Sequence, residues 1–197
     1  MSPLTTKPIY FGSFLVTSQV FHLTPLTFCL VNLKPLLPGH VLVSPLRAAP
    51  RLRDLTPAEA ADLFVTVRRV GRTLERVYGA SALNVAVQDG ADAGQSVPHV
   101  HAHIIPRRAD DLGAPREGGG PDKVYDLLEG EDGDVGRLLR ERDEGTGGRK
   151  GKFPAVDADE EREPRSEEEM RREAEWLAEE MKKDEEVEGE EKEAKGG

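Results

Sequence analysis

Short apolar runs separated by proline, glycine or polar residues occupy much of the first half of the chain. Four such runs lie at residues 20–23, 27–31, 41–43 and 83–88. Runs of this length, rich in β-branched residues and bounded by turn formers, are typical of β-strands. Because the breaks between the first three runs are short, the sequence predicts an antiparallel meander.

A longer apolar periodicity begins after Thr56. Thr56, Pro57 and Glu59 form a capping-box pattern with proline at the first helical position. The apolar side chains that follow recur at helical spacing and would form one stripe against the sheet. They are Leu63, Phe64, Val67, Val70, Gly71, Leu74, Val77 and Tyr78. The pattern predicts a helix over residues 57–78.

Three of the five histidines stand at alternate positions, His99, His101 and His103. Successive side chains on a β-strand point to opposite faces, so a strand would place the three imidazoles on one face and the apolar spacers on the other. A helix would turn His101 away from the outer two. With the elements before it, this strand completes a predicted α+β fold, a small antiparallel sheet with a helix across it.

Charge divides the chain into two parts. Residues 1–115 carry a net charge of +3 and residues 116–197 carry −13, which together give the total of −10. Acidic runs near the end contain too little apolar surface to offset the entropy of ordering. Before them, Ser166 and Glu169 form a second capping box, followed by apolar residues on one helical stripe. These are Met170, Ala174, Leu177 and Met181.

These patterns predict four segments along the chain. They are a folded domain at 1–115, a charged and largely irregular insertion at 116–165, a C-terminal helix at 166–183 and a disordered acidic tail at 184–197.

Composition excludes several classes of partner. The tail is acidic and the basic residues of the first part are scattered without interleaved aromatics, so we expect no nucleic-acid partner. Prolines and polar residues interrupt the apolar N-terminal region, so we expect no signal peptide, membrane span or membrane partner.

The one cysteine, Cys29, excludes an internal disulfide framework and fits a reducing compartment. We expect the protein in the cytoplasm, with the nucleus also open to it.

A zinc site is the first interpretation of the histidines to weigh. At about 3.3 Å per residue, His99 and His103 start about 13 Å apart, whereas zinc–nitrogen bonds are about 2.0 Å long. Two of the three could share an ion with His22 or His40, but no cysteine pair or carboxylate stands at a recognisable ligand spacing. Zinc binding therefore stays a minor hypothesis. A weaker hypothesis is that the three histidines are hydrogen-bonded surface residues without a chemical role.

Nucleophilic chemistry at phosphorus is favoured. A neutral imidazole is a nucleophile at physiological pH and can form a covalent intermediate. His101, the middle residue, is the natural nucleophile, and its neighbours on the same face could hydrogen-bond phosphate oxygens and the leaving group. Backbone N–H groups of the loop before the triad could add an anion-binding nest.

These residues resemble the signature of the histidine triad superfamily. The string Gln88-Asp89-Gly90, then Ala93-Gly94-Gln95-Ser96-Val97, precedes the three histidines. Further strings resemble the fragile histidine triad branch, the dinucleoside polyphosphate hydrolases, and the long charged insertion and tail resemble its fungal members. These strings are Leu30-Val31-Asn32-Leu33-Lys34-Pro35, Pro38-Gly39-His40-Val41-Leu42-Val43 and Pro45-Leu46-Arg47.

The resemblance implies a catalytic domain with a histidine-triad fold of five antiparallel strands, which hydrolyses diadenosine triphosphate to AMP and ADP through an AMP–histidine intermediate. It assigns His101 as the nucleophile and His103 as the group that binds phosphate and assists the leaving group. His99 and His40 would support the site by hydrogen bonds. The remaining residues would bind substrate: Asn32 the ribose, Gln88 the bridging phosphate region, and Gly94, Gln95, Ser96 and Val97 the phosphates.

The resemblance also implies a homodimer with a sheet continued across the interface. A Mg²⁺ or Mn²⁺ ion could enter with the substrate; no organic cofactor and no dedicated metal site are expected. One position departs from the pattern, because Phe14 stands where the animal branch has a substrate-contacting histidine. No role is assigned to Phe14.

Two other functions stay open on the sequence. A nucleoside phosphoramidase or nucleotidyltransferase of the same superfamily would share the nucleophile. Phosphoramidases tend to follow the triad with a glycine pair, whereas this chain has Ile104-Ile105-Pro106-Arg107, which favours the hydrolase. The third hypothesis is a binding module that signals to a partner in its nucleotide-loaded state.

Overall fold

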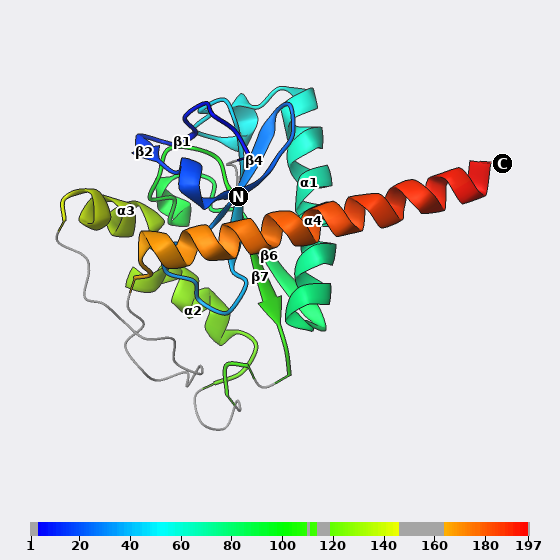
Figure 1. Ribbon diagram of the computed structural model, residues 1–197. Coiled ribbons are helices and arrows are strands. Elements are labelled where there is room, and N and C mark those ends of the chain that lie inside the picture. The colour runs from blue at the N-terminus through cyan, green and yellow to red at the C-terminus, as the bar shows by residue number, and fades with distance from the viewer. Residues whose placement is uncertain (1–3, 110, 114–118, 146–163, 197) are drawn as a thin grey trace.

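Five antiparallel strands form the central sheet of the computed structural model, which describes residues 4–109, 111–113, 119–145 and 164–196 (Figure 1). Their spatial order is β3-β4-β5-β7-β6. The first three are sequential neighbours, so the predicted antiparallel meander is confirmed. The strands are β3 (Val20–Leu23), β4 (Thr27–Val31), β5 (Val41–Pro45), β6 (Ala82–Ala86) and β7 (Ala102–Arg107).

The N-terminal segment forms a separate two-stranded hairpin. Strand β1 (Tyr10–Phe11) pairs with β2 (Phe14–Leu15), and Gly12 takes a φ of 60° in the turn between them. Phe11 and Phe14 are buried and belong to the main core cluster. The hairpin is thus fixed to the body of the protein by apolar packing.

Helix α1 (Pro57–Tyr78) has the bounds that the sequence predicts. The capping box is confirmed, since the Thr56 hydroxyl accepts from the Glu59 N–H and the Glu59 carboxylate accepts from the Thr56 N–H. Most of the predicted stripe is buried, and Val77 and Tyr78 at its end are partly buried against the core. Phe64 is 47% exposed, because it lies at the edge of the stripe.

Helix α4 (Glu167–Gly196) crosses strands β3 and β4 and also contacts α1 (Figure 1). Its predicted stripe is confirmed: Met170, Ala174, Leu177 and Met181 are all buried. The predicted disorder after residue 183 is wrong for the described residues, because the helix continues to Gly196. Asp184 contributes to this continuation by bonding to Thr73 and Arg76 of α1.

The insertion predicted to be largely irregular contains two short helices. They are α2 (Lys123–Glu129) and α3 (Val135–Asp143), and Asp134 caps the second by accepting from the Arg137 N–H. Each helix buries one or two turns of apolar side chains, such as Val124 and Leu138. Such short helices depend on tertiary packing, which the sequence pattern does not reveal. The start of the predicted insertion and its residues 146–163 lie outside the described part of the chain.

The histidine strand is shorter than predicted. Strand β7 begins at Ala102, so only His103 of the triad lies in the hydrogen-bonded ladder. The His99 N–H donates to the Val97 carbonyl at 2.7 Å, and Val100 donates to Ala49 instead of to a neighbouring strand. These local bonds bend the chain before β7. The apolar spacers Val100, Ala102 and Ile104 are buried as predicted.

Among the described residues, no helix combines the length and apolar character needed to cross a bilayer. Cys29 is buried in β4.

Candidate active site

Four histidines form a buried cluster where β5 and β7 lie side by side. His40 precedes β5 and hydrogen-bonds His103 on β7, while His101 and His99 lie in the segment just before β7. All four residues are at most 1% exposed. Burial in apolar surroundings penalises a charged imidazole. The histidine-bearing face that the sequence predicts is therefore shielded from solvent.

The hydrogen bonds of His40 fix its tautomer. The Leu36 N–H donates to His40 Nδ1 at 3.1 Å, so this nitrogen carries no proton. Its Nε2 therefore carries the proton and donates to His103 Nδ1 at 2.9 Å. His103 in turn must carry its proton on Nε2. That nitrogen is buried and has no hydrogen-bond partner among the described residues.

His103 is thus a neutral ring that presents an unused donor. Burial lowers its pKa well below 6.5, and the neighbouring His101 and His40 lower it further. A buried N–H without a partner costs free energy. An anionic ligand that accepted from this group would remove that cost.

His101 has the opposite tautomer. Its Nδ1 lies 2.8 Å from the His99 carbonyl oxygen, which can only accept, so Nδ1 carries the proton. The lone pair is left on Nε2. Burial lowers the pKa of His101 from 6.5 to about 4, so the ring is neutral at physiological pH. This is the state that a nitrogen nucleophile requires.

His99 uses both ring nitrogens in structural contacts. Its Nδ1 accepts from the Gly12 N–H at 3.0 Å, and its Nε2 donates to the Pro45 carbonyl at 2.7 Å. His99 therefore joins the turn of the β1–β2 hairpin to the end of β5. With both nitrogens occupied it has no free atom for chemistry.

Phe11 packs against two of the histidines. Its ring stacks on His99 with centroids 5.6 Å apart and meets His101 edge-on at 5.0 Å. Sequence reasoning missed this residue, since a phenylalanine in a two-residue strand carries no local sign of its contacts. His101 and His103 also meet edge-on at 4.9 Å.

The loop predicted to bind phosphates is brought near the triad but uses several of its polar groups internally. The Gln95 side chain accepts from the Gly90 N–H and donates to the Pro50 carbonyl, and the Ser96 hydroxyl accepts from the Gly136 N–H. The N–H groups of Gly94 and Gln95 donate to carbonyls within the loop.

Gln88 and Gly94 are close neighbours. Gly94 takes a φ of 85°, and a Cβ placed on it would lie 2.6 Å from Gln88 Nε2. The position therefore excludes a side chain both by backbone conformation and by contact. Gln88 Nε2 also makes a long bond of 3.4 Å to the Leu128 carbonyl of α2.

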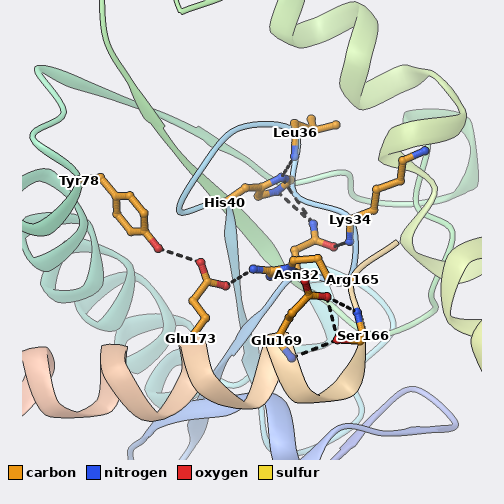
Figure 2. Close-up of polar contacts among 9 residues, drawn as sticks. All are labelled: Asn32, Lys34, Leu36, His40, Tyr78, Arg165, Ser166, Glu169 and Glu173. Carbon is orange, nitrogen blue, oxygen red and sulfur yellow. Dashed lines mark hydrogen bonds and ion pairs between the residues drawn. The ribbon is translucent and has the colours of Figure 1, made fainter. Parts of the chain in front are cut away.

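Asn32, predicted to bind the ribose, lies just after β4 and is 2% exposed. Its Nδ2 lies 3.5 Å from each ring nitrogen of His40, and its Oδ1 accepts from the Lys34 N–H at 3.2 Å. Its main-chain carbonyl accepts from the Arg165 side chain, which sequence reasoning did not connect with the site (Figure 2). The two residues are 133 positions apart, so no local pattern could have joined them.

Among the described residues, no group of three or more histidine, cysteine, aspartate or glutamate side chains is arranged to hold an ion. The His40 and His103 rings face each other with one hydrogen bond instead of converging on a shared point.

The fold and cluster together define an α+β protein in which a neutral imidazole with its lone pair on Nε2 lies beside an imidazole N–H donor, where the central strands β5 and β7 meet. Comparison with known proteins agrees. The HIT domain family model matches residues 14–110. The chain is 49% identical over 175 residues to the bis(5'-nucleosyl)-tetraphosphatase [asymmetrical] of Schizosaccharomyces pombe, covering 87% of this chain and 93% of that one.

A second relative and a solved structure extend the comparison. The chain is 50% identical over 129 residues to the bis(5'-adenosyl)-triphosphatase of Saccharomyces cerevisiae, covering 64% of this chain and 59% of that relative's length. The crystal structure of the C. elegans NitFhit protein superposes with a TM-score of 0.54 at 42% identity, over 68% of this chain and 31% of that one.

The chain belongs to the histidine triad family. The resemblance to fungal members of the fragile histidine triad branch, and the histidine-triad fold that it implied, are confirmed.

Proposed function

We propose that the chain hydrolyses dinucleoside polyphosphates, chiefly diadenosine triphosphate to AMP and ADP, through a covalent AMP–histidine intermediate on His101. The state of His101 carries the proposal: its ring is held through Nδ1 at 2.8 Å from the His99 carbonyl, which leaves a neutral Nε2 lone pair. The names of two relatives, a tetraphosphatase and a triphosphatase, support this class of substrate.

The first step forms one bond and breaks one. His101 Nε2 attacks the α-phosphorus, and the phosphorus–oxygen bond to the departing ADP breaks, with the electron pair leaving on ADP. The imidazole becomes positive as the nitrogen–phosphorus bond forms. The Nδ1–H bond to the His99 carbonyl then strengthens and stabilises this charge.

Water completes the cycle. It attacks the phosphorus of the AMP–histidine, loses a proton, and displaces the ring as the nitrogen–phosphorus bond breaks. AMP leaves and neutral His101 is restored. Splitting one displacement into two in this way is the general advantage of a covalent intermediate.

Neighbouring groups suit the negative charge that develops on the phosphate oxygens. His103 offers its unused Nε2–H, and the N–H groups of Ser96 and Val97 make no hydrogen bond within the described residues. These donors would bind phosphate oxygens, with Gly94 leaving room and Gln88 beside it. His40 holds His103 in its donor tautomer, and Asn32 would meet the ribose.

A divalent cation would enter with the substrate. Mg²⁺ or Mn²⁺ would neutralise the polyphosphate while the protein supplies no dedicated ligand group among its described residues. The chain's own chemistry rests on imidazole and main-chain donors.

The assembly we propose is a homodimer with a continuous sheet. Strand β6 pairs only with β7 in the described sheet, so its outer edge is open, and Val85 on this strand is 47% exposed. An open, partly apolar edge is suited to pairing with a second copy. Light scattering at micromolar concentration should give twice the chain mass, and a monomer would refute the dimer.

Turnover of two substrates tests the proposed function. Wild type and His101→Asn are incubated with diadenosine triphosphate and, separately, with diadenosine tetraphosphate, and the nucleotides are separated. We expect equal AMP and ADP from the first substrate, AMP and ATP from the second, and none from the variant. No turnover by folded wild type would refute the proposal. Faster cleavage of the tetraphosphate would reassign the preferred chain length, as the fission yeast relative's name would suggest.

A further inference from the structure

A line of polar contacts runs from helix α4 to the histidine cluster (Figure 2). Arg165, just before α4, makes three bonds to the segment that follows β4. Its N–H donates to the Leu33 carbonyl at 2.9 Å, its Nε donates to the Asn32 carbonyl at 3.1 Å, and its Nη2 donates to the same Asn32 oxygen. Arg165, which is 133 positions away in the sequence, thus holds the main chain at Asn32.

The guanidinium of Arg165 is itself held in place. Glu173, two turns into α4, forms an ion pair with it, and the Tyr78 hydroxyl donates to Glu173 at 2.8 Å. The Arg165 and Glu173 side chains are only 19% and 17% exposed, so water screens the pair weakly. Burial, followed by the charge of Glu173, raises the pKa of Tyr78, which keeps its hydroxyl a donor at any working pH.

Asn32 passes this restraint to the site. Its carbonyl is fixed by Arg165 while its side-chain amide lies against the His40 ring, 3.5 Å from both nitrogens. His40 in turn donates to His103 at 2.9 Å. A shift of the Asn32 main chain would therefore move the Asn32 side chain, which is the predicted ribose contact and lies against the His40 ring. The His40 ring in turn sets the tautomer of His103.

Contacts other than those of Arg165 also hold α4 on the body of the protein. The buried apolar stripe of α4 packs on the core, and Arg76 of α1 binds Glu180 at 2.6 Å and Asp184 at 2.8 Å. The two ion pairs join α4 to α1 and do not involve Asn32. Arg165 instead directs its guanidinium to a main-chain carbonyl of the site.

We infer that Arg165 is a positioning residue for the proposed reaction, acting through the Asn32 main chain on the Asn32–His40–His103 contacts. This inference rests on the proposed function for its kinetic consequence, but its structural consequence can be observed without substrate. Glu173 is a second positioning residue, since its ion pair orients the Arg165 guanidinium.

The experiment compares Arg165→Gln with Arg76→Gln, which removes another arginine that binds α4 but lies outside the line of contacts. Nitrogen-15 long-range spectra of the histidine rings report tautomers directly. We expect the His40 and His103 signals to shift or broaden in Arg165→Gln and to stay at their wild-type positions in Arg76→Gln. Unchanged His40 and His103 signals in Arg165→Gln would overturn the inference. Glu173→Gln, which keeps Arg165, covers the case in which Arg165→Gln fails to fold.

Kinetics with diadenosine triphosphate give a second readout. A displaced active-site group costs on the order of tenfold or more in kcat/KM, and we expect this loss in Arg165→Gln, mostly as a raised KM because Asn32 is the affected contact. In the Asn32→Ala background, Arg165→Gln should lower kcat/KM little further, since the Asn32 side chain that links Arg165 to His40 is already absent. Equal losses for Arg165→Gln and Arg76→Gln, or fully additive losses with Asn32→Ala, would show a docking role only. If wild type hydrolyses nothing, the proposed function fails and the ring spectra alone decide the inference.

Discussion

Replacing His101 by asparagine should reduce the loss of folded-state stability in acid. Burial lowers the pKa of His101 from 6.5 to about 4. Between these values the unfolded chain binds a proton at His101 that the folded chain does not. The free energy of unfolding therefore falls as pH falls from about 6.5 toward 4, and this contribution is absent above about pH 7.5.

The size of the effect follows from the two pKa values. One pKa unit corresponds to about 1.4 kcal/mol, so protonation of His101 in the unfolded chain costs the folded state about 2 kcal/mol at pH 5 relative to pH 7.5. A change of this size is a large part of the stability of an ordinary domain.

Denaturant unfolding at pH 7.5 and pH 5 measures this cost. The single tryptophan, Trp176 on α4, stands edge-on to Tyr78 with centroids 5.5 Å apart, so its fluorescence reports the docking of α4. His22, His99 and His103 also have lowered pKa values, but they are present in both proteins and largely cancel in the difference. An equal loss of stability in wild type and His101→Asn would refute the lowered pKa assigned to the buried His101.

Four further outcomes are expected. Because His101 stays neutral above about pH 4, kcat/KM for diadenosine triphosphate should show no titration near pH 6.5, and a fall centred there would contradict a buried nucleophile. Thr56→Ala should lower the free energy of unfolding by about 1 kcal/mol, since the Glu59 N–H loses its cap; urea titration measures this. Leu177→Ala should cost about 3 kcal/mol in the same assay, because the side chain is fully buried. Truncation after Lys183 should cost on the order of 1 kcal/mol through loss of Asp184 while turnover stays unchanged, and reduced turnover would show that the end of α4 reaches the site.

The sequence predicted those elements whose stabilising residues are close together along the chain. Helix α1 was found with its bounds because Thr56 and Glu59 cap each other three residues apart. The strands of the meander followed from short runs between turn formers. Helices α2 and α3 were missed because Val124 and Leu138 are stabilised by distant packing partners.

The candidate site divides in the same way. Spacing alone identified His99, His101 and His103, and resemblance added His40 and Asn32. Neither could identify Phe11 against the triad or Arg165 on the Asn32 carbonyl. The second contact is made to a main-chain oxygen, and every residue type has one, so the sequence carries no sign of it.

The unequal roles of three identical side chains arise from the main chain around them. His99 faces a main-chain donor at one nitrogen and a carbonyl at the other, so both are occupied. His101 meets a carbonyl through Nδ1, which forces the proton onto Nδ1 and the lone pair onto Nε2. Within the described part of the chain, no main-chain group bonds to the His103 ring. Its tautomer is set by His40, whose own tautomer is set by the Leu36 N–H. A lone pair at His101 and a donor at His103 therefore stand side by side, because β7 begins at Ala102 and the bend before it turns the His99 carbonyl toward the next ring.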